Sequence, residues 1–372
     1  MVRFPATILF LVLAAVSTGV AVQAAELDPS PTNTGTILVS DERENNANPY
    51  SNQARIDVLA PGTLVNVRTM NNSADAQINS YGILTNSSTG TITNPDAFIR
   101  VYGGTFTNEG TVNNSGDDGY IWTDGGTALT NKGVINNSAS GYILNDSTAN
   151  PAVMTNQGTI TNTGASYIQN YGVFTNSSAG TITNTGASYI ENYGVFTNSS
   201  AGTITSTDSH IKVYNGSTFT NEGTINNSGN AGDIETNSGS TFTNKGTIVN
   251  SGSGWIYNDS LTGGKTAIMI NEGTITNTGA SYIENFGKFT NSSTGIINNT
   301  GSSSIDNYDT FTNKGTINNS ADIWTDTGTT LTNEGTFTNS SGATLGNTGT
   351  ITNSGTLELG AGSSYNFTGG TL

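Results

Sequence analysis

Apolar residues recur along this chain at short, regular intervals, and polar segments separate them. Phe174, Ile182, Ile190 and Phe196 follow one another at steps of 8, 8 and 6 residues. Each lies in a short unit, "FTN", "TITN" or "YIEN", in which apolar and polar residues alternate as in a strand with one buried face. Asn and Gly close these units, and both tolerate the left-handed backbone that a sharp corner needs. The pattern predicts short strands joined by corners.

A longer repeat contains these units. A large apolar residue followed by Thr-Asn, or a close variant of it, returns every 20 to 27 residues, which is a solenoid period. The thirteen markers are Leu84, Phe106, Leu129, Met154, Phe174, Phe196, Phe219, Phe242, Met269, Phe289, Phe311, Leu331 and Ile351. Because one coil alone cannot bury its apolar side chains, identical coils are expected to stack like on like.

These periods predict an all-β fold, a right-handed parallel β-helix (solenoid) with about three short strands per 20–27-residue coil. The handedness follows the general preference for right-handed crossovers. Phe174, Ile182 and Ile190 are expected to point inward, and their Thr neighbours Thr175, Thr181 and Thr183 are expected to point outward. Asn residues should form hydrogen-bonded columns along the axis. Extra residues, as between Asn258 and Lys265, should bulge at a corner.

The chain divides into three segments. Residues 1–24 predict a secretory signal peptide, with Arg3, an apolar run from Ile8 to Val16, and small residues before a cleavage site at Ala24. Pro29, Pro31, Pro49 and Pro61 and four of the five arginines precede the first marker, Leu84. We therefore expect residues 25–62 to be an N-terminal cap over the open strand edge. Residues 63–372 form the predicted β-helix repeat domain.

The last coil shows no such cap. After Ile351 come Leu357 and "YNFTGGTL", about one further coil. An uncovered strand edge pairs readily with another chain, so we expect end-to-end self-association or a missing C-terminal anchor at this end.

The charge of the chain excludes some classes of binding partner. The formal net charge is −16, with only 11 Lys and Arg residues. Nucleic acid and anionic lipid both need clustered cations and are therefore not expected as partners. The chain has no Cys, although an exported protein could use disulfides. Recurring Ile, Val, Phe and Tyr argue against the disorder that a polar, low-complexity composition would otherwise suggest.

Three stretches carry a family resemblance. "FTNEGTINNSG", "GTITNTG" and "GTLELGAGS" resemble coils of bacterial surface and secreted β-helix proteins, especially autotransporter passenger domains and haemagglutinin-like adhesins. The resemblance covers residues 64–372. It implies an exported protein that is either secreted or displayed on the cell surface, on the exterior of a Gram-negative outer membrane. Such passengers continue into an outer-membrane barrel, whose strand pattern does not follow the repeats here.

Candidate chemistry is sparse. His210 is the only histidine, and "SHIKV" aligned with "SYIEN" places it where other coils have Tyr167, Tyr189 or Tyr282, so we interpret it as a column variant. Corner carboxylates are a second candidate: Asp124 and Asp146 on adjacent coils could act as a glycosidase pair or share a cation, or could simply cap corners. Asp259 and Asp326 occupy the same kind of corner. We assign no catalytic, cofactor or metal residues.

Aromatic residues form a further pattern. Tyr171, Tyr193 and Phe286 share one position, and Tyr102 and Tyr214 lie beside it. Such a row could stack on sugar rings or on itself between coils. Trp122 and Trp324 each follow an inward Ile and are expected to face solvent about nine coils apart.

The function expected from these features is a secreted or cell-surface structural and adhesive β-solenoid without catalysis. Its partner would be a host or environmental surface, carbohydrate included. One alternative is an ice-binding solenoid, since outward Thr residues of "TIT" units could form a regular array. These units begin at Thr91, Thr159, Thr181, Thr203, Thr274 and Thr350. The other alternative is a β-helix enzyme that degrades polysaccharides.

Overall fold

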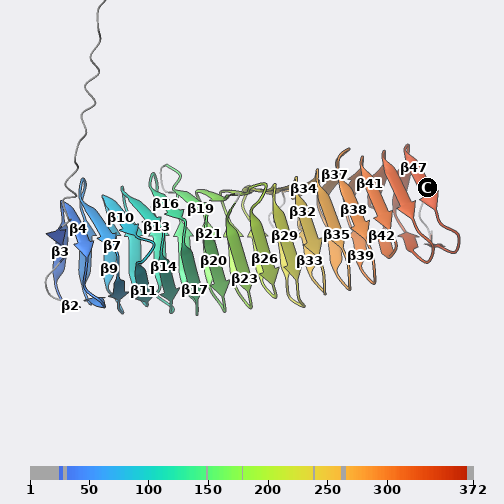
Figure 1. Cartoon of the computed structure of the whole chain (residues 1–372). Coiled ribbons are helices and arrows are strands. Elements are labelled where there is room, and N and C mark those ends of the chain that lie inside the picture. The colour runs from blue at the N-terminus through green and yellow to red at the C-terminus, as the bar shows by residue number, and fades with distance from the viewer. Residues whose placement is uncertain are drawn as a thin grey trace, which may run out of the picture.

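The chain folds into one elongated stack of short strands (Figure 1). The computed structural model describes residues 25–27, 32–147, 150–177, 179–237, 239–260 and 265–366. Within these ranges every regular element is a β-strand, and no helix long and apolar enough to cross a membrane is found. The strands form three parallel sheets of 16 strands each. Each coil contributes one strand to each sheet.

The first sheet contains the Thr-Asn markers. Its strands are β1 (Ala25–Glu26), β4 (Glu42–Asn45), β7 (Thr63–Asn66), β10 (Ile83–Asn86), β13 (Thr105–Asn108), β16 (Ala128–Asn131), β19 (Val153–Asn156), β22 (Val173–Asn176), β25 (Val195–Asn198), β28 (Thr218–Asn221), β31 (Thr241–Asn244), β34 (Ile268–Asn271), β37 (Lys288–Asn291), β40 (Thr310–Asn313), β43 (Thr330–Asn333) and β46 (Thr350–Asn353).

The second sheet contains most of the "TITN" units. Its strands are β2 (Thr32–Asn33), β5 (Tyr50–Asn52), β8 (Thr69–Asn72), β11 (Thr91–Pro95), β14 (Thr111–Ser115), β17 (Val134–Ser138), β20 (Thr159–Thr163), β23 (Thr181–Thr185), β26 (Thr203–Thr207), β29 (Thr224–Ser228), β32 (Thr247–Asn250), β35 (Thr274–Asn277), β38 (Ile296–Asn299), β41 (Thr316–Asn319), β44 (Thr336–Asn339) and β47 (Thr356–Leu359).

The third sheet contains the "YIEN" units. Its strands are β3 (Thr36–Val39), β6 (Arg55–Val58), β9 (Gln77–Ser80), β12 (Phe98–Val101), β15 (Tyr120–Thr123), β18 (Tyr142–Asn145), β21 (Tyr167–Asn170), β24 (Tyr189–Asn192), β27 (His210–Val213), β30 (Asp233–Thr236), β33 (Trp255–Asn258), β36 (Tyr282–Asn285), β39 (Ser304–Asn307), β42 (Asp322–Thr325), β45 (Thr344–Asn347) and β48 (Ser364–Asn366).

Strands pair in register between successive coils. In the first sheet Phe174 pairs with Phe196, and Phe196 pairs with Phe219. In the second sheet Ile182 pairs with Ile204. The predicted all-β solenoid with three strands per coil is therefore confirmed, and so is the place of every marker from Leu84 to Ile351 on the first sheet. Its right-handedness stays a prediction.

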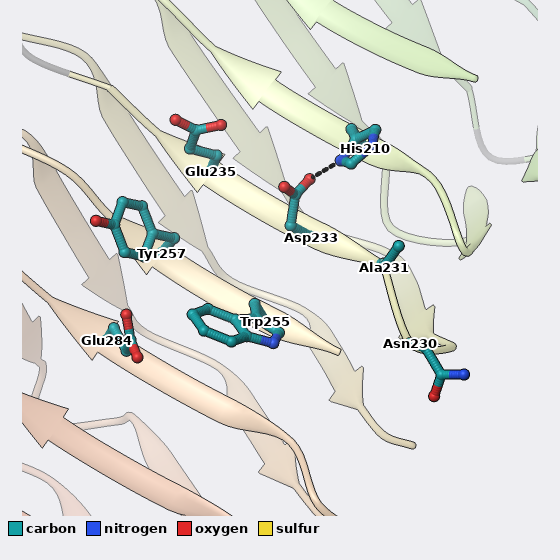
Figure 2. A pocket seen from close by; sticks show the side chains of 9 residues that line it. His210, Asn230, Ala231, Asp233, Glu235, Trp255, Tyr257 and Glu284 are labelled. Carbon is teal, nitrogen blue, oxygen red and sulfur yellow. Dashed lines mark hydrogen bonds and ion pairs between the residues drawn. The ribbon is translucent and has the colours of Figure 1, made fainter. Parts of the chain in front are cut away.

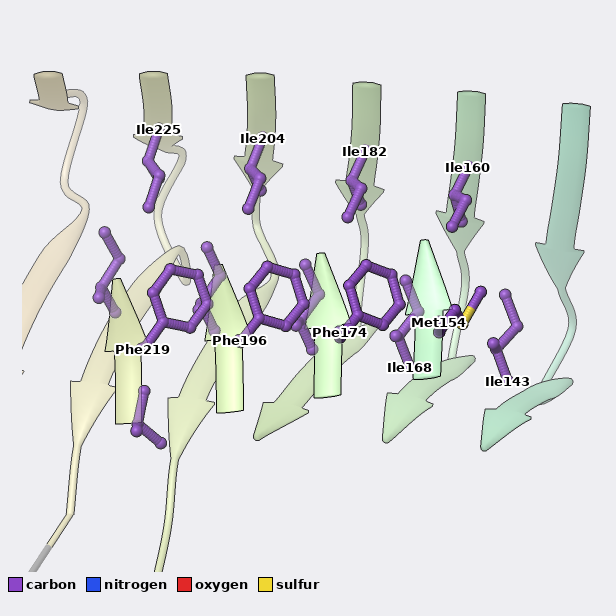
Figure 3. Packing of buried hydrophobic residues seen from close by; sticks show 14 of the residues in the cluster. Ile143, Met154, Ile160, Ile168, Phe174, Ile182, Phe196, Ile204, Phe219 and Ile225 are labelled. Carbon is purple, nitrogen blue, oxygen red and sulfur yellow. The ribbon is translucent and has the colours of Figure 1, made fainter. Parts of the chain in front are cut away.

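The core is a set of like-on-like columns inside the coils (Figure 3). Phe174, Ile182 and Ile190 are fully buried, as predicted. The rings of Phe174 and Phe196 stack with centroids 4.6 Å apart, and the next ring, Phe219, repeats that spacing. The predicted outward Thr residues beside them are partly exposed. Parallel stacking explains the repeated sequence, because an in-register coil places each ring on an identical neighbour.

The Asn at or near the end of most strands has a different place from the one that the sequence pattern predicts. It does not close a corner in the left-handed conformation: in Asn176 and Asn198 the side chain points inward and is fully buried. In the first sheet these side chains form one unbroken ladder from Asn45 to Asn353, each amide donating to the next Asn oxygen at 2.7–2.8 Å. The predicted hydrogen-bonded columns are thus confirmed, within the core.

Glycine is required at two kinds of corner, for two different physical reasons. Gly186 has a φ of +71°, the left-handed corner that the sequence predicts. Gly194 has no such conformation, but a Cβ there would lie 2.3 Å from the Gly172 oxygen of the preceding coil. The close approach of successive coils therefore selects glycine at the second kind of corner.

The first described coils already belong to the solenoid. Strands β1 to β6, within the segment predicted as a cap, pair with later strands of the same three sheets. The three sheets therefore continue across the predicted boundary between residues 62 and 63. Arg43 occupies the column position that Leu64 holds in the next coil and forms an ion pair with Asp41. A capping role for 25–62 stays a prediction. The predicted signal peptide, residues 1–24, and most of the expected corner bulge, residues 261–264, lie outside the described residues.

Candidate binding face on the third sheet

The outward side chains of the three sheets differ in kind. In the first two sheets they are mostly Thr and Asn, whereas in the third sheet they are mostly aromatic or charged. We call this surface the third-sheet face. It consists of the first and third residue of each third-sheet strand and the residue that follows the strand.

One column of the third-sheet face is a stack of rings. Phe98, Tyr120, Tyr142, Tyr167, Tyr189 and His210 lie on successive coils, with centroid spacings of 5.8, 4.9, 5.0, 5.1 and 4.5 Å. His210 pairs in register with Tyr189 and stacks on its ring, so its interpretation as a column variant is confirmed. The faces of rings inside the column are covered by their neighbours, so a sugar ring cannot stack on them.

A second aromatic column follows the strands at the corner. Tyr171 and Tyr193 stack at 4.6 Å, and Tyr193 and Tyr214 stack at 5.0 Å. Phe286 occupies the same position further along and stacks on Tyr308 at 4.4 Å. The predicted shared position is confirmed, and the rings stack on each other between coils. Burial raises the pKa of Tyr214 to about 12, so its hydroxyl stays protonated near neutral pH.

The two tryptophans singled out in the sequence behave differently. Trp324 is 38% exposed on β42. Trp122 lies nine third-sheet strands earlier, on β15, as predicted, but it is only partly exposed. The Tyr102 ring packs against it edge-on at 5.7 Å, and the Arg100 guanidinium lies 5.7 Å from its ring centre. Solvent therefore reaches Trp324 more than it reaches Trp122.

A hollow of about 500 Å³ opens where the first aromatic column is interrupted (Figure 2). The interruption is Asp233, which takes the column position between His210 and Trp255. Its carboxylate reaches back to His210 Nδ1 at 2.7 Å. The hollow is lined chiefly by His210, Asp233, Glu235, Trp255, Tyr257 and Glu284.

The charges around this hollow are unevenly compensated. Asp233 contacts His210, and Glu235 forms an ion pair of 3.0 Å with Lys212. Glu284 forms no ion pair with a described residue and pairs in register with another carboxylate, Asp306. Burial raises the pKa of Glu284, and the charge of Asp306 adds to the effect. Burial likewise raises the pKa of Asp306, against a hydrogen bond from the Ser304 hydroxyl.

Two more hollows lie on the same face. One, near the C-terminal end, is lined by Tyr282, Asp306, Tyr308, Asp322 and Trp324, among others. The other, near the N-terminal end, is lined by Phe98, Arg100, Tyr120, Trp122 and Leu144. Concave sites with aromatic walls therefore occur at three places along the third-sheet face.

The corner carboxylates are occupied by local contacts. Asp124, Asp146 and Asp326 each accept a hydrogen bond from the backbone N–H of the next residue, at 2.7, 2.6 and 2.7 Å. Asp259 holds the equivalent place after β33 and is buried. Asp124 and Asp146 do follow paired strands on adjacent coils. Among the described residues no group of three or more His, Cys, Asp or Glu side chains could hold a metal ion. The contacts seen are those of corner capping.

The threonine array is shorter than its sequence pattern suggests. Thr91, Thr159, Thr181, Thr203 and Thr274 all begin second-sheet strands, but Thr350 begins β46 in the first sheet. Only Thr159, Thr181 and Thr203 lie on consecutive coils. The structure therefore reduces the continuous "TIT" array to three coils.

The hollow at Trp255 was not foreseen from the sequence. The signal was present, because "GDIET" at 232–236 has Asp233 where "SYIEN" in other coils has Tyr. Its meaning depends on the rings in the coils before and after it, more than 20 residues away in sequence.

The fold defines the class of this chain, a β-solenoid protein. No protein-family model matches the chain, and no curated protein matches it. Among solved structures it is similar to a crystal structure of a TibC-catalyzed, hyper-glycosylated fragment of TibA, residues 55–350. The sequence identity is 14%, and the match covers 94% of this chain and 96% of that chain, with a TM-score of 0.27.

Proposed function

We propose that this chain is a secreted or cell-surface structural β-solenoid that adheres through its third-sheet face and performs no catalysis. One observation carries the proposal: the outward aromatic rings of the described strands and all three hollows described above lie on one of the three faces. Stacking between coils explains the uniform columns of rings, but it does not explain the hollows where these columns are interrupted. The partner would be a host or environmental surface, including its carbohydrate.

The physical basis is the contrast between core and face. Inward columns are uniform because each coil must match its neighbours, so they define a rigid rod. The columns of the outer face can change from one coil to the next, as at Asp233, and can therefore form a site for a ligand. Rigid aromatic residues supply contact area at low entropic cost, which suits an adhesive surface.

Adhesion of beads coated with residues 25–372 tests the proposal. The beads are offered a panel of immobilised glycans and cell surfaces, and bound beads are counted under flow. We expect binding to part of the panel, and its loss in a variant that combines Trp255→Ala, Tyr308→Ala and Trp324→Ala. Each of the three residues is 38% exposed, which limits the cost of the substitutions in folding free energy. Thr312→Ala with Thr332→Ala on the first sheet is the matched control.

Three results would contradict this function. Adhesion that survives the third-sheet variant but fails in the first-sheet control would place the binding surface elsewhere. Release of reducing ends from a polysaccharide panel, abolished by Asp124→Asn or Asp146→Asn, would make the chain an enzyme. Thermal hysteresis that disappears when Thr181 and Thr203 are replaced by bulky residues would favour ice binding.

A further inference from the structure

The hollow at Trp255 is a missing layer in an aromatic stack. On one side the ring of Tyr189 covers the His210 ring at 4.5 Å, and on the other side Tyr282 contacts Trp255 at 5.1 Å. Between them the column position belongs to Asp233, which has no ring. His210 and Trp255 are two coils apart, about 10 Å at the usual strand spacing. One ring placed midway would therefore continue the stack.

The walls of this gap combine apolar and polar groups. Trp255 and Tyr257 lie on one strand and present their rings on the same side (Figure 2). Asn230, Ala231 and Gly232 close the end of the hollow where the corner enters β30. Its volume of about 500 Å³ lies within the usual range for small-ligand sites. A ring with one apolar face and polar substituents, as in a sugar, matches such walls.

The charge of the hollow selects among sugars. Asp233 pairs with His210 and Glu235 pairs with Lys212, both in the preceding coil. Glu284 instead lies in register with a second carboxylate, Asp306, in the next coil. The hollow therefore has uncompensated negative charge beside two aromatic rings. A cation is attracted both by carboxylates and by ring faces, and this face already has such contacts, with Lys212 Nζ 5.6 Å from the Tyr189 ring centre. An acidic sugar would be repelled.

We propose that the gap between His210 and Trp255 binds an amino-sugar unit of a glycan, a hexose ring with a free, protonated amine. The ring stacks on Trp255, and the ammonium lies toward Glu284 and Tyr257. This assignment rests on the proposed adhesive function and adds to it the chemical class of the ligand.

Titration calorimetry with three probes tests the assignment. The probes are a tetramer of β-1,4-linked glucosamine, its fully N-acetylated counterpart and tetralysine, offered to residues 25–372 at a pH where the amines are protonated. We expect the glucosamine tetramer to bind at least about 10-fold more tightly than the N-acetylated one, since the latter lacks the charge. Tetralysine should bind more weakly, because it has no ring to fill the gap.

Variants test the residues. Trp255→Ala and Glu284→Gln should each weaken binding of the glucosamine tetramer by about 10-fold or more, whereas Trp255→Phe, which keeps a ring, should retain most of it. Asp233→Tyr fills the gap with a ring and should abolish binding while the urea midpoint stays at or above that of the wild type. Glu272→Gln is the matched control: it removes one carboxylate from an exposed corner after β34, off the third-sheet face.

Several outcomes would overturn the assignment. They are equal affinity for the N-acetylated tetramer, Trp255-dependent binding of tetralysine at the same strength, or an equal loss in Glu272→Gln and Glu284→Gln. The assignment is also overturned if neither saccharide binds. If coated beads still adhere through the third-sheet face in that case, only the ligand class is wrong; if adhesion is also absent, the proposed function fails with it.

Discussion

The side-chain amide of Asn176 donates a hydrogen bond of 2.7 Å to the side-chain oxygen of Asn198, one coil further along the axis. Both side chains are fully buried. Asn198 in turn donates to Asn221 at 2.8 Å and to the Gly202 carbonyl oxygen at 3.1 Å. A buried amide is tolerated only when its donors and acceptor are satisfied. Asn176 and Asn198 both meet that condition, and their ladder fixes the axial register of the coils.

Removing one rung should therefore be costly. Asn198→Ala leaves the Asn176 amide and the Asn221 oxygen without their ladder partners, and we expect a loss of about 3 kcal/mol in the free energy of unfolding. Urea denaturation followed by circular dichroism measures it. The outward Asn226→Ala is the control, with an expected change within about 0.5 kcal/mol. Equal effects would mean that the ladder contributes nothing specific.

The aromatic core column should tolerate shape changes but not cavities. Phe219 is fully buried between Phe196 and Phe242. Phe219→Ala should cost about 3–5 kcal/mol, because the stacked coils cannot collapse around the gap. Phe219→Leu should cost less than about 2 kcal/mol, since Leu129 occupies the same column in another coil. Urea midpoints of the two variants give the comparison, and the reverse order would contradict this packing.

The close approach of coils should make one class of glycine irreplaceable. At Gly194 an added Cβ would meet the Gly172 oxygen at 2.3 Å, so Gly194→Ala should destabilise by about 1–3 kcal/mol. At Gly35 an added Cβ meets nothing within 4 Å. Gly35→Ala should be neutral or slightly stabilising, because it restricts the unfolded chain. Thermal unfolding of both variants tests this, and a neutral Gly194→Ala would show that the coils can move apart.

Stability should depend on pH through Glu284 and Asp306. Burial raises the pKa of both carboxyls, so the folded chain holds protons that the unfolded chain releases. These two carboxyls therefore contribute fully to the free energy of unfolding below their ordinary pKa values of 4.5 and 3.8. This contribution is lost as the pH rises through their raised pKa values in the folded chain.

Asp306→Asn should remove the part of this pH-dependent loss of stability that is due to Asp306. We expect its urea midpoint to exceed that of the wild type at pH of about 7, and the difference to vanish near pH of about 4. Glu272→Gln, on an exposed corner, serves as control. A gain that is independent of pH, or one of equal size in the control, would contradict the account.

The sequence by itself determined the solenoid. The period of the markers, the alternation around Ile182 and the recurrence of Phe174 as Phe196 were enough to predict parallel coils, three strands per coil and the inward residues. This was possible because a solenoid repeats one local geometry, so neighbours in space lie one period apart in sequence. A pattern read along the chain is then also a pattern read across the sheets.

Only the tertiary structure decided what breaks that pattern. It placed Asn176 in the core and explained Gly194 by the oxygen of the coil beside it, whereas the sequence pattern placed both residues at left-handed corners. It also showed that the stacked tyrosines cover one another and that Asp233 leaves a gap beside Trp255. Each of these depends on side chains from two or three coils at once, and their sizes and directions set the geometry. Local periodicity cannot supply that information, because the repeat describes the average coil and the candidate site lies where one coil departs from it.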